Sequence, residues 1–141
     1  MKNASLVTDY VKRCKARLKG IDTLHAESAW ADVVRESQEV VELALKALLR
    51  FSLIEVPRIH DVSDILQQNL STLPEVVRPH VDRMCGISRS LRRDRELAFY
   101  GSEDLTPSEF YKKADADEAR ADAGWLVACV AEACGLAKPA T

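Results

Sequence analysis

The strongest helical signal in the sequence lies between residues 26 and 51. Apolar or small side chains recur there every three or four residues, at Trp30, Val33, Ser37, Val40, Val41, Ala44 and Leu48. Because an α-helix has about 3.6 residues per turn, this spacing gathers the side chains on one face. A helix of this length with one apolar face must be covered by other elements. We therefore expect residues 26–51 to form the central packing helix.

Four further segments have helical patterns, and none alternates apolar and polar residues as a β-strand does. The predicted helices span residues 5–19, 61–68, 79–98 and 106–135. Gly20 is expected to end the first of these helices and Gly135 the last, because glycine is common just after a helix. The prediction is an all-α fold, an up-and-down bundle of four to five helices.

The sequence also predicts which faces of the first and last helices turn inward. In the first helix the inward residues are Leu6, Tyr10, Cys14 and Leu18, and in the last they are Phe110, Ala114, Ala121, Trp125 and Ala128. The last helix has the clearest start signal, because Thr106, Pro107 and Glu109 have the spacing of a capping box.

The length and charge of the chain limit its organisation and its partners. With 141 residues it fits one domain, residues 1–141, with a core from about residue 5 to 135. A net charge of −2 argues against a generally basic nucleic-acid binder, so any such contact must be local. No apolar run approaches the roughly 20 residues of a membrane helix, and no signal peptide is recognisable. We expect a cytoplasmic protein that does not enter a membrane.

The residue types that bind metals are few and scattered. They are Cys14, Cys85, Cys129, Cys134, His25, His60 and His80. No two cysteines have CxxC spacing, so we expect reduced thiols, no metal and no cofactor. His60 stands beside Asp61 at a predicted helix start, where such a pair is more often structural than catalytic.

The stretch RRDRELAFYG, residues 92–101, is the candidate functional segment. Arg95 is in helical register with Ser88, Leu91 and Ala98, which places a cation on the stripe where a helix normally carries its inward, apolar side chains. A cation there needs a partner. The partner is either the phosphate of a ligand, bound together with Arg92 and Tyr100, or a carboxylate of the central helix, Glu39 or Glu42.

The order of these segments is itself informative. A long helix containing ELALKALL is followed by a proline break, the His60-Asp61 pair, the Arg95 to Gly101 segment and an alanine-rich helix. From Thr8 to Ala133 this order resembles the HEPN domain of prokaryotes. The resemblance implies a helical bundle that forms homodimers. It also implies a nucleotidyltransferase partner protein in a two-component, toxin–antitoxin-like system.

The resemblance lacks one element. Many such domains are metal-independent ribonucleases with an Arg-x(4–6)-His motif, yet no histidine follows His80 in this sequence. RNA cleavage through the 2′-hydroxyl needs a group that exchanges protons near neutral pH. Histidine ordinarily titrates near pH 6.5 and tyrosine near pH 10. A tyrosine at position 100 is therefore a poor replacement as general base.

Three functions remain open. The favoured one is a non-catalytic domain that binds a nucleotide or nucleic-acid phosphate, or a partner protein, through Arg92, Arg95 and Tyr100. The second is a ribonuclease with a degenerate active site, in which Arg95 stabilises the phosphate and Tyr100 replaces the histidine. The third is a structural interaction bundle, in which Arg95 pairs internally with Glu39 or Glu42.

Overall fold

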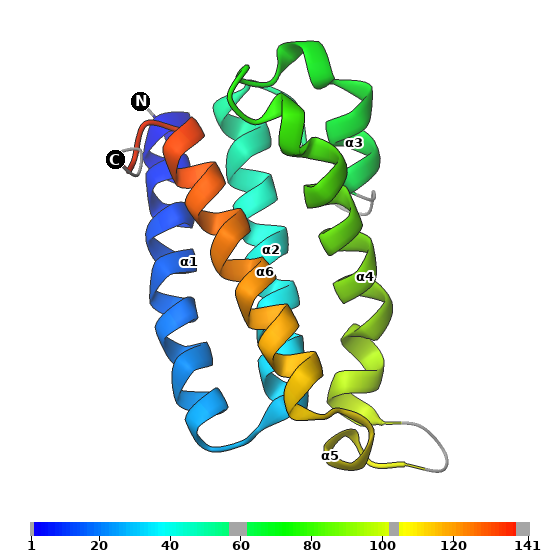
Figure 1. Cartoon of the computed structure of the whole chain (residues 1–141). Helices are drawn as coiled ribbons and strands as arrows, with labels where there is room; N and C mark the ends of the chain where they lie inside the picture. The colour runs from blue at the N-terminus through cyan, green and yellow to red at the C-terminus, as the bar shows by residue number, and fades with distance from the viewer. Residues whose placement is uncertain (1, 57–61, 102–104, 138–141) are drawn as a thin grey trace.

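The computed structural model describes residues 2–56, 62–101 and 105–137, and gives only the backbone for residues 2 and 94–99. Its elements are α1 (Lys2–Ala26), α2 (Trp30–Phe51), α3 (Val62–Gln68), η1 (Leu70–Thr72), η2 (Arg78–His80), α4 (Val81–Tyr100), α5 (Pro107–Phe110) and α6 (Lys113–Ala133). The four long helices α1, α2, α4 and α6 run up and down, while α3 lies against α4 and α5 lies at one end (Figure 1). The described residues contain no β-strand, and the predicted all-α bundle is confirmed.

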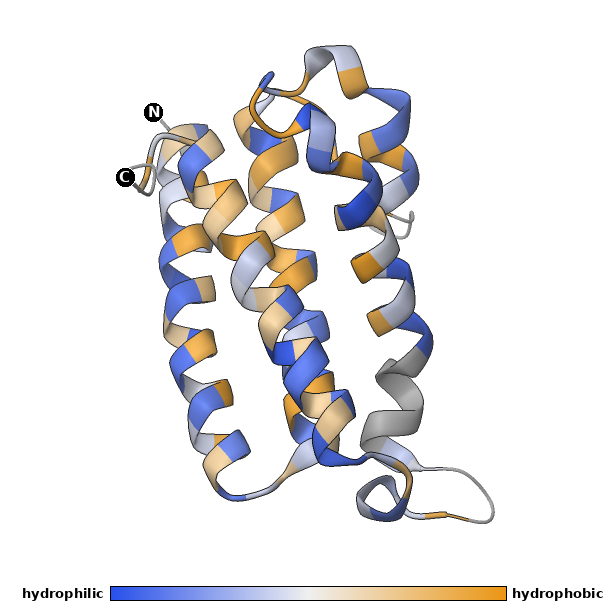
Figure 2. Ribbon diagram, in the orientation of Figure 1, coloured by the Kyte–Doolittle hydropathy of each residue, from blue (hydrophilic) through white to orange (hydrophobic). Residues whose placement is uncertain are grey.

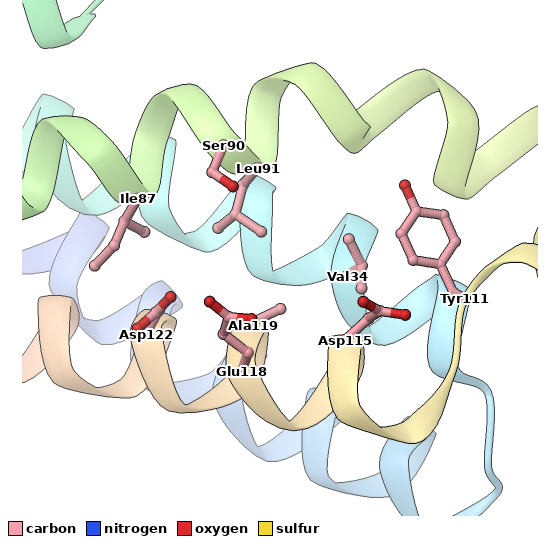
Figure 3. A pocket seen from close by; sticks show the side chains of 9 residues that line it. All are labelled: Val34, Ile87, Ser90, Leu91, Tyr111, Asp115, Glu118, Ala119 and Asp122. Carbon is pink, nitrogen blue, oxygen red and sulfur yellow. The ribbon is translucent and has the colours of Figure 1, made fainter.

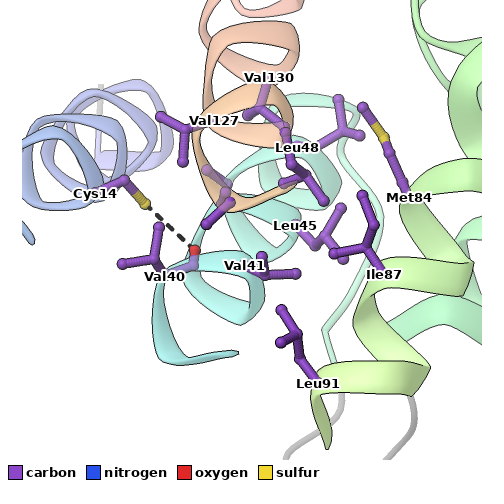
Figure 4. Packing of buried hydrophobic residues seen from close by; sticks show 14 of the residues in the cluster. Cys14, Val40, Val41, Leu45, Leu48, Met84, Ile87, Leu91, Val127 and Val130 are labelled. Carbon is purple, nitrogen blue, oxygen red and sulfur yellow. Dashed lines mark hydrogen bonds between the residues drawn. The ribbon is translucent and has the colours of Figure 1, made fainter. Parts of the chain in front are cut away.

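Helix α2 is the central packing helix, as predicted, and contacts α1, α4 and α6. Its buried residues are Ala31, Val33, Val34, Ser37, Gln38, Val40, Val41, Ala44, Leu45, Ala47, Leu48 and Leu49. In Figure 4, Leu45 and Leu48 lie between Met84 and Ile87 of α4 on one side and Val130 of α6 on the other. In Figure 2, apolar residues of α1 and of the first half of α4 lie mainly on the side of each helix that faces the rest of the bundle.

Helix α1 does not end at Gly20, which corrects the sequence prediction. It continues to Ala26, because glycine within a helix costs only about 0.5–1 kcal/mol relative to alanine and one more turn buries Ile21 completely. The chain turns at Ser28, which has a φ of 58°, and α2 begins at Trp30 rather than at residue 26.

The inward face of α1 also differs from the prediction by about one residue. Val7, Val11 and Cys14 are buried, whereas Leu6 is 37% exposed. Cys14 was correctly placed, and its Sγ donates to the carbonyl oxygen of Val40 at 3.6 Å. Tyr10 and Leu18 were assigned to the core but pack only partly buried against it.

Helices α3 and α4 lie close to their predicted positions. Helix α3 begins at Val62, and residue 61 lies outside the described residues. Helix α4 starts two residues later than predicted, after the short helix η2, and reaches Tyr100. Its predicted inner residues Met84, Ser88 and Leu91 are buried. The side chains at positions 95 and 98 lie outside the described part.

The last predicted helix is two helices. The capping box is confirmed, because Thr106 Oγ1 accepts a hydrogen bond from the amide of Glu109 at 3.2 Å. The helix it starts, α5, makes only one turn, because the backbone becomes extended at Tyr111 and brings that side chain to 3% exposure. Helix α6 then begins at Lys113, where the amide of Lys112 donates to Asp115 at 2.9 Å.

This break changes the inward face of α6. The buried residues are Ala116, Ala119, Ala123, Leu126, Val127, Val130 and Ala131. The predicted inner residues Ala114, Ala121 and Ala128 are exposed instead. Alanines occur on all sides of this helix, so small side chains did not identify its inner face. The predicted end is confirmed, because Gly135 follows the helix with a φ of 71°. None of the helices in the described part of the chain is both long and apolar enough to cross a membrane.

Candidate functional site

The C-terminal half of α4 carries arginines that reach neighbouring helices. Arg92 Nη2 donates to Glu42 Oε1 of α2 at 3.0 Å, and the two side chains are 35% and 22% exposed. One turn earlier, Arg89 Nη2 donates to Gln67 of α3 at 2.9 Å and lies 3.3 Å from Asp64. These contacts hold α4 against α2 and α3 near residues 89–92.

From the sequence, Arg95 is expected to pair either with a ligand phosphate or with Glu39 or Glu42 of α2. The side chain of Arg95 lies outside the described part. Among the described residues, Arg92 binds Glu42. Glu39 lies half-buried on the same helix. The predicted pairing of Arg95 with Glu39 or Glu42 stays a prediction, because the side chain at position 95 lies outside the described part.

Helix α4 ends at an exposed aromatic residue. Tyr100 is 74% exposed, and Arg93 is exposed on the same half of the helix. Gly101 follows with a φ of 83°. A Cβ at Gly101 would lie 2.7 Å from the carbonyl oxygen of Leu105 and 2.8 Å from Cδ of Pro107. Only glycine fits this close approach of position 101 to Leu105 and Pro107.

A small hollow of about 70 Å³ lies between α4 and α6, and the sequence did not predict it (Figure 3). Its lining residues are Val34, Ile87, Ser90, Leu91, Tyr111, Asp115, Glu118, Ala119 and Asp122. Burial, and after it the charge of Glu118, raises the pKa of Asp122, while the charge of Arg83 lowers it. Negative charge on this scale disfavours a phosphate, so this hollow is not the phosphate site. The three-and-four spacing of Asp115, Glu118 and Asp122 is the sequence pattern that could have indicated an acidic face at this hollow.

The two described histidines are held away from the end of α4. His25 of α1 forms a 2.6 Å hydrogen bond with Asp117 of α6 and packs edge-on against Trp30. His80 packs edge-on against Trp125 at the start of α4, about 30 Å along the helix from Tyr100. The His25–Asp117 contact joins positions 92 residues apart, so no sequence spacing could have shown it. His60 and Asp61 lie outside the described residues.

Among the residues that the structure describes, no group of three His, Cys, Asp or Glu side chains is placed to hold a metal ion. Three of the described thiols have raised pKa values. Burial raises the pKa of Cys14 and of Cys134 to about 11, and burial is the main cause of a raised pKa at Cys129. A thiol that stays protonated is a weak nucleophile.

Comparison with known proteins gives one finding. Residues 7–133 match the family model described as the HEPN domain. No curated protein and no solved structure matches the chain significantly.

Proposed function

The chain belongs to the HEPN domain family, and we propose that it is a non-catalytic member that binds the phosphate of a nucleotide or nucleic acid at the C-terminal end of α4. The observation that carries the proposal is the 74% exposure of Tyr100. Tyr100 lies on the same half of α4 as the arginine cluster, which consists of Arg92, Arg93 and Arg95. The proposed surface consists of Arg92, Arg93 and Tyr100, and the sequence adds Arg95 to it.

The chemistry of these side chains fits a phosphate beside a base. A guanidinium has five N–H donors in a fixed fork, so it can bind a carboxylate with one donor and a phosphate with others. Glu42 already orients Arg92, which lessens the side-chain entropy lost when a ligand binds. An exposed tyrosine ring is a stacking platform, worth about 1–3 kcal/mol per base. The helix end itself carries partial negative charge, so the arginines have to supply the attraction.

The proposed lack of turnover rests on proton transfer. The family's ribonuclease motif needs a histidine after the arginine, and the sequence has none beyond His80. His25 is bound to Asp117, and His80 lies at the opposite end of α4. An arginine and a tyrosine can hold a phosphate, but neither ordinarily exchanges a proton near neutral pH.

The test is a fluorescence anisotropy titration with a labelled single-stranded RNA of about 12 nucleotides, a length within the range of known single-strand sites. Tyr100→Ala should weaken binding at least about fivefold, in keeping with the loss of one stacked base. Arg13→Ala is the matched control, because it removes an exposed cation on α1 and should leave the affinity unchanged. Equal affinities for wild type and Tyr100→Ala would refute the proposal.

The same RNA, incubated with wild-type protein and a chelator and run on a gel, tests for turnover. The proposal predicts intact RNA. Cleavage that Arg95→Ala abolishes would instead establish the ribonuclease alternative.

One observation favours a second candidate, the structural interaction bundle. The half-buried Arg92–Glu42 pair is the kind of contact that stabilises a fold without any ligand. If Arg92→Ala lowers the unfolding temperature steeply while RNA and nucleotides show no binding to wild type, this structural role is the correct one. A homodimer and a nucleotidyltransferase partner remain predictions from the family resemblance, and light scattering would test the first against the chain mass of 15.7 kDa.

A further inference from the structure

A groove lies along helix α1 and beside the segment that follows α6. Helix α1 itself lies across the bundle from α4 (Figure 1). The groove holds about 580 Å³ and is lined by Thr8, Val11, Lys12, Lys15, Ala16, Lys19 and Leu136. Its residues on α1 span Thr8 to Lys19, about 17 Å along the helix. Leu136, which follows α6, forms part of its wall and packs against the core.

The rim of the groove is positive over three successive turns. Lys12, Lys15 and Lys19 follow one another at spacings of three and four residues, so they stand on one face of α1. All three are exposed, and none forms an ion pair with a described residue. Arg17 of the same helix differs, because it faces α2 and lies 3.3 Å from Glu36. No acidic side chain lines the groove.

The floor between these lysines is apolar. Val11 is 3% exposed, Ala16 has a small side chain that allows close approach, and Leu136 closes one side. A nucleic-acid backbone would use the lysines but gain little from such a floor, because phosphates and sugars are polar. A lipid bilayer is flat and would not fill a concave groove. A ligand that is apolar on one face and acidic along its flanks fits both the floor and the rim.

We propose that this groove is a docking site for an acidic amphipathic helix of a partner protein. Charge complementarity with the three lysines selects the partner, and the apolar floor receives its apolar face. Helix-in-groove recognition of this kind uses anchors at i, i+3 or i+4, and i+7. The 17 Å length matches about three turns of a partner helix. The site is independent of the proposed phosphate surface, so either can be wrong without affecting the other.

The experiment uses a stapled, fluorescent peptide of about 14 residues, or four helical turns, with leucines on one face and glutamates on both flanks. Lys12→Glu, Lys15→Glu and Lys19→Glu should each weaken its binding about fivefold, the scale of one exposed charge contact. Arg13→Glu makes the same charge change on the same helix outside the groove lining, and should have less than a twofold effect.

Two further measurements separate the apolar floor from charge alone. Ala16→Gln leaves the charge unchanged but places an amide on the floor, and it should also weaken peptide binding severalfold. A control peptide with glutamines in place of the glutamates should bind to wild type about tenfold or more weakly, because it loses several charge contacts.

Three results would overturn the proposal. The first is no saturable binding of the acidic peptide to wild type. The second is an equal loss of affinity in Arg13→Glu and Lys15→Glu, which would mean unspecific attraction. The third is that Lys15→Glu weakens binding of a labelled single-stranded RNA but leaves binding of the acidic peptide unchanged. That result would make the groove a nucleic-acid site.

Discussion

The Arg92–Glu42 ion pair can be measured with a double-mutant cycle. Arg92→Met keeps most of the aliphatic stem and removes the charge, and Glu42→Gln keeps the shape and removes the charge. The double variant lacks both charges, so the part of the two losses that is not additive is the coupling energy of the pair. This coupling bears directly on whether Arg92 stabilises the fold or serves only a ligand.

The expected size follows from the exposure of the two side chains, 35% and 22%, and their 3.0 Å contact. Opposite charges about 4 Å apart attract by about 4 kcal/mol at an effective dielectric constant near 20, and desolvation offsets much of this. Exposed pairs retain about 0.2–1 kcal/mol, whereas breaking a buried pair costs about 3–5 kcal/mol. The half-buried pair should therefore have a coupling energy of about 1–2 kcal/mol.

Urea unfolding followed by circular dichroism gives the four free energies of unfolding that the cycle needs. The Arg89–Asp64 pair is the matched control, because it also joins α4 to a neighbouring helix but its side chains are 48% and 60% exposed. Its coupling should be below about 0.5 kcal/mol and should fall in high salt. If the coupling energy of Arg92–Glu42 is no larger than that of Arg89–Asp64, then the interpretation that Arg92 stabilises the packing of α4 against α2 is refuted.

Further predictions concern a glycine, a pH dependence and the thiols. Gly101→Ala should destabilise the fold by more than about 1 kcal/mol, because alanine strains a left-handed backbone and meets Leu105. Gly20→Ala should instead stabilise it by about 0.5–1 kcal/mol, because it lies in open space within a helix; thermal unfolding of both variants checks this pair. The hydrogen bond between Asp117 and His25 lowers the pKa of Asp117. The contribution of the Asp117 carboxylate to the free energy of unfolding is therefore fully present above the ordinary carboxyl pKa of about 4. It is lost as the pH falls through the lower pKa of the folded state. The stability difference between wild type and Asp117→Asn should shrink in acid urea titrations, and a difference that grows there would contradict this. A thiol reagent on native protein should label half-buried Cys129 well before fully buried Cys14, and mass spectrometry would show the opposite order if the packing of α1 were wrong.

The sequence predicted those parts of the fold in which apolar periodicity is strong. Most inner residues of α2 and the inner residues Met84 and Leu91 of α4 were predicted correctly, because large aliphatic side chains mark these faces, as Val33 and Leu48 do. Trp30 of α2 is only partly buried. The end of α1 was wrong because a single glycine is a weak stop signal when the next turn can bury Ile21. The inner face of α6 was wrong because alanine is small enough to lie inside or outside, and Ala121 is exposed.

The candidate site was predictable only in part. The Arg92–Glu42 contact was not predicted, because it depends on the rotation of α4 against α2, and packing sets that rotation. The predicted pairing of Arg95 with Glu39 or Glu42 falls on a side chain outside the described part. The His25–Asp117 contact depends on how α1 lies against α6, and such a tertiary contact leaves no local pattern. The lysines of the α1 groove do follow a local spacing, but the part of its wall formed by Leu136 depends on where the chain runs after α6. The need for glycine at position 101 could be suspected from the helix end, but its cause is the close approach of Pro107.

The most direct test of the account is to map where RNA binds. In an NMR titration of isotope-labelled protein with a single-stranded RNA of about 12 nucleotides, amide signals should move for residues 89–101 at the end of α4. Signals of the lysine groove on α1, residues 8–19, should stay in place. Shifts confined to the α1 groove, or no shifts at saturating RNA, would contradict the claim that the arginines and Tyr100 of α4 form the phosphate-binding surface.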